Sequence, residues 1–113
     1  MSKLADSVYT ALKKVFPHNV IIKEHYVSFR GVRLFFDFYI KDLGVLIEAQ
    51  GRQHEEFVQH FHVDRDGFMA SKKRDRLKHE YCAKEGLVLV SFDDDDVLSE
   101  SNLLNTIWSK MTS

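Results

Sequence analysis

The stretch from Leu34 to His54, LFFDFYIKDLGVLIEAQGRQH, most constrains what this chain can fold into. Residues 34–40 form a run of aromatic and aliphatic side chains, and residues 45–50 form a second apolar run. The four residues between them, Lys41-Asp42-Leu43-Gly44, have the composition of a turn. We therefore predict a hairpin of two adjacent strands.

The predicted register of this hairpin brings two carboxylates together. A four-residue loop pairs Ile40 with Val45, and counting back along both strands then sets Asp37 opposite Glu48. Strict alternation puts Asp37 on the face of Phe35 and Tyr39. The opposite face is predicted to be apolar and to consist of Phe36, Phe38, Ile40, Val45, Ile47 and Ala49.

Two carboxylates that stand roughly 5 Å apart across a sheet repel each other by up to ~1 kcal/mol. Such a pair usually holds a cation. Two carboxylates, a backbone carbonyl and waters suit a hard octahedral ion such as Mg²⁺. The alternative is a solvated pair on an exposed hairpin, which the solidly apolar opposite face disfavours.

The composition predicts one domain that spans residues 1–113. Apolar residues make up 44% of the chain, which is enough for a core, and the net charge of −1 means that any nucleic-acid surface must be local. A single cysteine excludes an internal disulfide framework. The sequence shows no apolar run of membrane-spanning length and no signal peptide, so we expect a cytoplasmic protein without a membrane partner.

The remaining pattern predicts an α/β (α+β) fold in the order α-β-β-β-α-β-α, with a central mixed sheet flanked by helices. The further predicted elements are helices at Leu4–Phe16, Phe68–Lys84 and Ser99–Met111 and strands at Val20–Tyr26 and Leu87–Phe92. The residues predicted to form the buried helix stripes are Leu4, Val8, Leu12, Val15 and Phe16, then Ala70, Arg74, Leu77 and Tyr81, then Leu103, Leu104, Ile107 and Trp108. Glu24 lies on the strand that should neighbour the hairpin, which makes it the candidate for a third carboxylate.

A helix, a three-stranded meander with an acidic pair on its second and third strands, and then a helix and a strand resemble the core of the PD-(D/E)XK nuclease superfamily. The residues of the motif are Asp37, Glu48 and Gln50. A narrower resemblance is to the branch of the very-short-patch-repair endonucleases and the phage homing endonucleases named for an E-D-x-H-D pattern. It includes Glu48, Gly51, Gln53-His54, Arg74-Asp75, Lys78 and Tyr81-Cys82.

The resemblance implies a restriction-endonuclease-like core and a Mg²⁺-dependent endodeoxyribonuclease, with Mn²⁺ as the alternative ion. The implied substrate is DNA, cut on one or both strands in phage homing or in DNA repair and recombination, within a bacterial or phage-infected cell. Such a small chain is expected to need a second copy, in a homodimer or larger oligomer, to cut both strands. One departure is position 50, where glutamine replaces the usual lysine.

We predict that the metal is bound by Asp37, Glu48 and the Ala49 carbonyl, with Glu24 completing its coordination directly or through water. Gln50 does not titrate, so it would only orient a water molecule. His54 is the better general base, because imidazole titrates near neutral pH. Asp75 would orient the His54 ring or act on the metal through water.

A concentrated basic run predicts the DNA-contacting surface. Lys72, Lys73, Arg74, Arg76 and Lys78 are five of the 16 lysines and arginines of the chain, and Arg52 would extend this surface. A helix face that is merely exposed to solvent would have a similar sequence. Asp75 would then simply pair with Lys72, Lys78 or His79, which is worth about 0.2–0.5 kcal/mol, and His54 would be an ordinary surface histidine.

Three hypotheses follow from the sequence. The first is the metal-dependent endonuclease. The second is a DNA-binding module of the same fold that has lost turnover, as Gln50 suggests. The third is a structural or interaction domain in which the carboxylates are surface features.

Overall fold

The structure is a computed structural model and describes residues 3–50, 65–94, 96 and 98–112. Its elements are α1 (Lys3–Val15), β1 (Ile21–Phe29), β2 (Val32–Ile40), the 3₁₀ turn η1 (Lys41–Leu43), β3 (Val45–Ala49), α3 (Arg65–Glu85), β4 (Val88–Phe92) and α4 (Glu100–Met111). This succession confirms the predicted α-β-β-β-α-β-α order and the α+β class.

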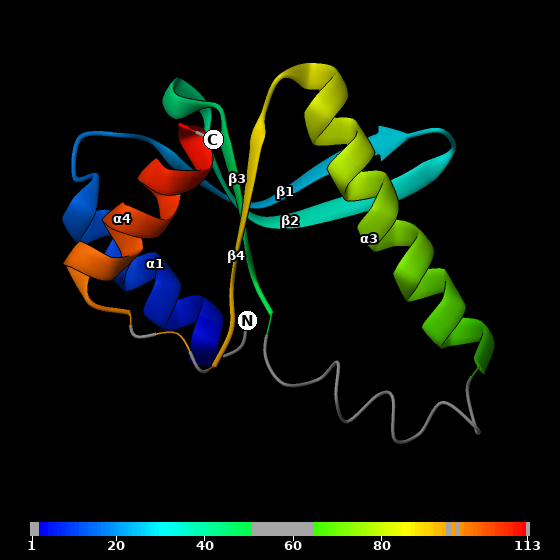
Figure 1. Ribbon diagram of the computed structural model, residues 1–113, viewed down its shortest axis with the longest axis horizontal. Helices are drawn as coiled ribbons and strands as arrows, with labels where there is room; N and C mark the ends of the chain where they lie inside the picture. Colours follow the sequence, from blue (N-terminus) through cyan, green and yellow to red (C-terminus); the bar gives the residue numbers. More distant parts are fainter. Residues whose placement is uncertain (1–2, 51–64, 95, 97, 113) are drawn as a thin grey trace.

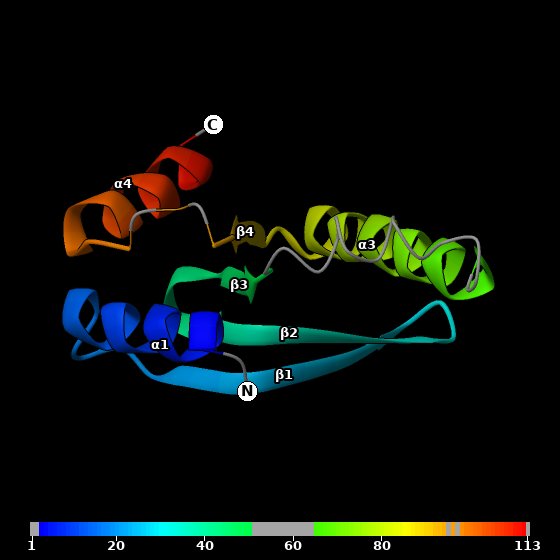
Figure 2. The same cartoon turned by 90° about the horizontal axis from the view of Figure 1, so that it is seen from below.

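The four strands form one mixed sheet in the order β1-β2-β3-β4. β1 and β3 pair with β2 in antiparallel fashion, whereas β3 and β4 are parallel. Figure 1 shows β3 and β4 nearly edge-on, with α1 and α4 on one side and α3 on the other. In Figure 2 the β1–β2 hairpin runs along the molecule from the α1–α4 end to the α3 end. Helices therefore cover both faces of the parallel strand pair, as such pairs require.

Two hydrophobic clusters lie on the two faces of the sheet. The α1–α4 cluster has the buried members Ala5, Val8, Ala11, Leu12, Phe38, Ile40, Val45, Ile47, Val90, Phe92, Leu103 and Ile107. The smaller α3 cluster has the buried members Phe29, Leu34, Phe36, Leu46, Leu77 and Cys82. Alternation along β3 explains the division, because Val45 and Ile47 point to the first cluster and Leu46 points to the second.

The turns set the two hairpin registers. In the β2–β3 connection Ile40 pairs with Val45, as predicted, and the left-handed Gly44 closes the turn by donating its N–H to the Lys41 carbonyl. In the β1–β2 connection both central residues, Arg30 and Gly31, have positive φ, 52° and 75°. This is the geometry of a two-residue type I′ turn, which matches the twist of the strands that it joins.

The side-chain alternation of β2 inverts at Asp37. On one side of it, Phe38 stacks on Tyr9 of α1 with ring centroids 5.7 Å apart. On the other side, Phe36 contacts Tyr81 of α3 at 6.1 Å. The two phenylalanines flanking Asp37 therefore face opposite sides of the sheet, although alternation alone would put them on the same side.

β1 inverts at the same level, where Glu24 has a left-handed φ of 53° between its paired neighbours. The prediction that Asp37 shares one face with Phe35 and Tyr39 is therefore wrong, as is the placement of Phe36 with Phe38. Tyr39 packs in the α3 cluster, whereas Phe35 is 56% exposed on the opposite face. A residue with left-handed φ reverses which face of the sheet the following side chains occupy. The hydrophobic periodicity of a strand does not predict such a residue.

Two of the predicted helix stripes are too wide. Leu103 and Ile107 anchor α4 as predicted, but Leu104 and Trp108 are exposed, Trp108 by 62%. In α3, Leu77 is buried, Tyr81 is half-buried and the earlier stripe residues Ala70 and Arg74 are exposed. Figure 1 shows the reason, because the N-terminal half of α3 diverges from β3 and β4.

Candidate active site

Glu48 is the buried acidic residue at the centre of the candidate site. It lies near the end of β3, on the face toward α3, and is only 5% exposed. The ammonium of Lys78 forms an ion pair with its Oε1, and the side-chain amide of Gln50 donates to its Oε2 across 2.9 Å. Both carboxylate oxygens therefore have a donor, one charged and one neutral.

Lys78 reaches Glu48 because its neighbours in α3 pack against the sheet. Leu77 and Cys82 of the same helix are buried in the α3 cluster, which turns the adjacent face of this part of α3 toward β3. The ammonium of Lys78 also lies over the ring of Phe36, with Nζ 5.4 Å from the ring centroid. The sequence predicted Lys78 only as one of the DNA contacts of the basic run, because its contact with Glu48 depends on how α3 packs against β3.

Asp37 lies where the strands β2 and β3 separate. The pairs Phe38–Ile47 and Ile40–Val45 have the predicted register, and the pairing extends as far as the residues next to Asp37 and Glu48. Its Oδ2 accepts the backbone N–H of Ala49 across 2.8 Å. The carboxylate therefore replaces the carbonyl that a regular ladder would offer to this N–H, which gives Asp37 a structural role besides any chemical one.

The remaining predicted metal ligand, Glu24, is exposed on β1. Within residues 3–50, 65–94, 96 and 98–112, no three histidine, cysteine, aspartate or glutamate side chains gather closely enough to hold a metal ion. The structure thus brings Asp37, Glu48 and Gln50 to one end of β3 with Lys78, and it does not add Glu24 to them.

Cys82 lies within electrostatic reach of this network. Burial raises the pKa of its thiol to about 11, with the Glu48 charge adding to the rise and the Lys78 charge opposing it. The thiol is therefore protonated and unreactive at neutral pH.

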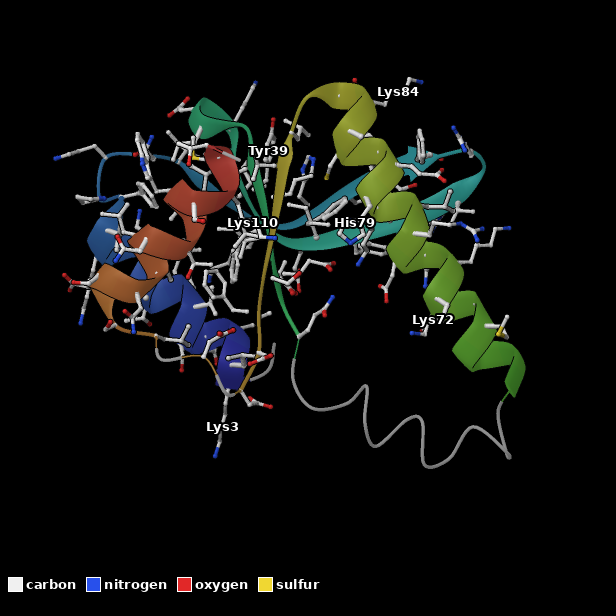
Figure 3. The ribbon with its side chains drawn as sticks, viewed as in Figure 1. Lys3, Tyr39, Lys72, His79, Lys84 and Lys110 are labelled. Carbon is white, nitrogen blue, oxygen red and sulfur yellow. The ribbon has the colours of Figure 1, made fainter. Side chains whose placement is uncertain are left out.

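The basic run lies along α3. Lys72, Lys73, Arg74 and Arg76 are exposed, and Asp75 is half-buried between them. Figure 3 shows Lys72 toward the N-terminal end of this helix and Lys84 near its C-terminal end. The predicted base His54 and the predicted DNA contact Arg52 lie outside the described residues.

A hollow of about 840 Å³ lies elsewhere, between α1 and the start of α4. Its lining includes Asp6, Thr10, Lys14, Asp96, Ser99 and Glu100. None of the predicted site residues borders it. Among the described residues, no helix has the length and apolarity that crossing a bilayer needs.

The chain is similar to three viral proteins. It is 41% identical to uncharacterized protein 094L of Frog virus 3 over 61 residues, or 53% of this chain and 39% of that protein. It is 33% identical to uncharacterized protein 033L of Invertebrate iridescent virus 3 over 60 residues, 31% of that protein. Its match to uncharacterized protein 307L of Invertebrate iridescent virus 6 is also 33% identical, over 54 residues and 27% of that protein. The chain thus spans less than half the length of these relatives, and neither a family model nor a solved structure matches it.

Proposed function

We propose that this protein is a metal-dependent DNA endonuclease whose active site is formed by Asp37, Glu48, Gln50 and Lys78. The observation that supports the proposal most is the meeting of the Lys78 ammonium and the Gln50 amide on the buried carboxylate of Glu48. A half-buried lysine paired with a buried carboxylate is suited to a substrate that is itself an anion, such as a phosphodiester.

The chemistry of the donors fits Mg²⁺ or Mn²⁺. Ionised carboxylates have two oxygens and about four acceptor positions each, so Asp37 and Glu48 have positions left beyond their present hydrogen bonds. The Ala49 carbonyl, and Glu24 through water, would complete the coordination. When bound, such an ion neutralises the scissile phosphate and lowers the pKa of a water molecule.

The protein side chains would divide the remaining work. Lys78 would move its ammonium from Glu48 to a phosphate oxygen, which supplies the positive charge that Gln50 lacks. Gln50 would orient the attacking water through its amide. His54 is the predicted proton acceptor, with Asp75 as its orienting partner, and the exposed cations of α3 would bind the DNA backbone.

Nicking of supercoiled plasmid in Mg²⁺ or Mn²⁺, with EDTA as the metal-free control, tests the proposal. We expect Glu48→Gln and Asp37→Asn to lower the rate at least 100-fold, because each removes one negative charge at the metal. Asp37→Asn keeps an oxygen that can accept the Ala49 N–H, so loss of nicking in a folded variant reflects chemistry. Lys13→Met, which alters an exposed lysine on α1, is the matched control and should cut normally. Equal rates for all variants would exclude this site.

The second candidate is a DNA-binding module without turnover. The specific observation in its favour is that Lys78 already compensates the charge of Glu48 and that Gln50 occupies the second oxygen. Calorimetric titration with Mg²⁺ separates the two candidates. Metal binding that Asp37→Asn abolishes favours the enzyme, and DNA binding without metal binding favours the module.

The biological setting follows from the same proposal. A single copy would nick, and a homodimer would place two sites on opposite strands. Phage homing and DNA repair or recombination are the proposed settings. The matched relatives are viral proteins whose names assign no activity.

A further inference from the structure

Two exposed aromatic rings lie side by side on one face of the β1–β2 hairpin. Tyr26 and Phe35 are cross-strand partners with ring centroids 5.2 Å apart. They are 45% and 56% exposed, whereas Leu34 and Phe36 on the opposite face of the same strand are buried in the α3 cluster. Because of the inversion at Asp37, the half of the hairpin nearer the β1–β2 turn has one face against α3 and the other toward solvent.

An arginine accompanies these rings. The guanidinium of Arg33 lies 5.8 Å from the centroid of the Tyr26 ring. Arg33 pairs with Ser28, two residue pairs nearer the turn than Tyr26 and Phe35. We call Tyr26, Arg33 and Phe35 the hairpin aromatic face. The acidic residues nearest in sequence are Glu24, two residues before Tyr26, and Asp37, two residues after Phe35, and both lie at the level where the hairpin inverts.

We propose that the hairpin aromatic face binds unpaired nucleotides, with bases stacked on Phe35 and Tyr26 and a phosphate paired with Arg33. Exposed rings on a sheet surface with a neighbouring cation have the two properties that single-stranded nucleic acid recognises, a flat apolar surface for the base and a positive charge for the backbone. In a duplex the bases are stacked on one another, so their faces are hidden from such rings. The inference rests on the proposed function only in taking DNA as the ligand, and it adds that the substrate contains a single-stranded segment.

Fluorescence anisotropy of an end-labelled oligothymidylate of roughly 12 nucleotides tests this directly, in EDTA so that no cleavage occurs. We expect Phe35→Ala and Tyr26→Ala each to weaken binding by about tenfold. Phe35→Trp should keep the affinity, because it keeps the stacking surface. Trp108→Ala, which removes an exposed aromatic ring from α4, is the matched control and should bind like the unaltered protein.

The salt dependence of the same binding separates the rings from the arginine. Arg33→Gln should reduce the slope of log affinity against log salt by about 0.7, the value for one phosphate contact on a single strand, and Phe35→Ala should leave the slope unchanged. Equal affinities for the two ring variants and the unaltered protein would overturn the inference. So would a concentration-dependent dimer in sedimentation that Phe35→Ala abolishes in a protein that does not bind the oligonucleotide.

The two proposals fail separately. Plasmid nicking that depends on Glu48, with oligonucleotide binding that ignores the rings, would overturn the inference and keep the endonuclease. Ring-dependent binding without any nicking would support the inference and remove the endonuclease.

Discussion

Glu48 shows what one buried charge requires of its surroundings. A carboxylate moved out of water loses several kcal/mol of solvation, which only good geometry and complete hydrogen bonding recover. Here Lys78 provides the opposite charge and Gln50 provides the neutral donor. Because the lysine side chain is only 16% exposed, the pair is closer to a buried ion pair than to a surface one.

Removing the lysine should therefore destabilise the folded protein. We predict that Lys78→Met lowers the free energy of unfolding by about 3 kcal/mol, because it leaves a buried carboxylate without its cation. Adding Glu48→Gln should recover a large part of this loss, since the charge that needed compensation is then gone. Urea unfolding of the two single variants and the double variant measures this coupling.

The control is Lys73→Met, on the exposed side of the same helix, which should change the free energy of unfolding by less than about 0.5 kcal/mol. A double variant whose loss equals the sum of its parents' losses would show that the two side chains do not interact.

The thiol of Cys82 makes stability depend on pH. Its pKa is raised from the ordinary 9.0 to about 11 in the folded protein. The stability that its protonated form contributes is complete below the unfolded pKa and is lost as the pH rises toward the folded one. We predict that between pH 9 and 11 the free energy of unfolding falls more steeply in the unaltered protein than in Cys82→Ala. Urea unfolding across that range measures both slopes, and parallel slopes would contradict the prediction.

At the scale of elements, the β1–β2 hairpin changes its alternation at Glu24 and Asp37. A left-handed conformation costs a residue other than glycine about 1–2 kcal/mol. We predict that Glu24→Gly raises the free energy of unfolding by about 0.5–1 kcal/mol, because glycine adopts this conformation freely but loses more entropy on folding. Thermal or urea unfolding measures the gain.

Glu24→Ala serves as the control, since it removes the carboxylate without relieving the backbone. It should be neutral or slightly destabilising. If both variants instead lost metal-dependent nicking while remaining folded, Glu24 would be a ligand of the metal as the sequence suggested.

The sequence predicted those elements whose pattern is local. The turn residues 41–44 set the β2–β3 register, so the pairing up to Phe38 and Ile47, next to Asp37 and Glu48, was foreseeable. The inversion at Asp37 was not, because it depends on a backbone conformation at Glu24 that no periodicity encodes. Nor was the Lys78–Glu48 contact, which joins residues on separate elements and depends on the docking of α3. Leu104 and Trp108 were misplaced because apolar character alone does not say which side of a helix meets the core.

At the scale of the whole molecule, metal binding and folding should be linked. A ligand that binds only the folded state stabilises it by about 2.7 kcal/mol at 100 times its Kd. We predict that Mg²⁺ raises the thermal midpoint of the unaltered protein and leaves that of Asp37→Asn unchanged. Differential scanning calorimetry with and without EDTA measures both midpoints.

Lys78→Met tests whether the lysine and the metal compete for Glu48. If the lysine and the metal share Glu48, the variant should show a larger rise in its midpoint with Mg²⁺ than the unaltered protein does. A rise of the same size in all three proteins would mean that the ion binds elsewhere.

The reversed side-chain alternation at Glu24 and Asp37 also affects how the two strands of the β1–β2 hairpin align during folding. In an ordinary hairpin a slip by two residues returns every side chain to its own face, so the turn alone must reject that mispairing. Here the same slip would move the left-handed Glu24 away from Asp37, to the level of Phe35 or Tyr39. A single alignment then buries the correct side chains in both halves of the hairpin. The left-handed Glu24 opposite Asp37 therefore disfavours misregistered strands.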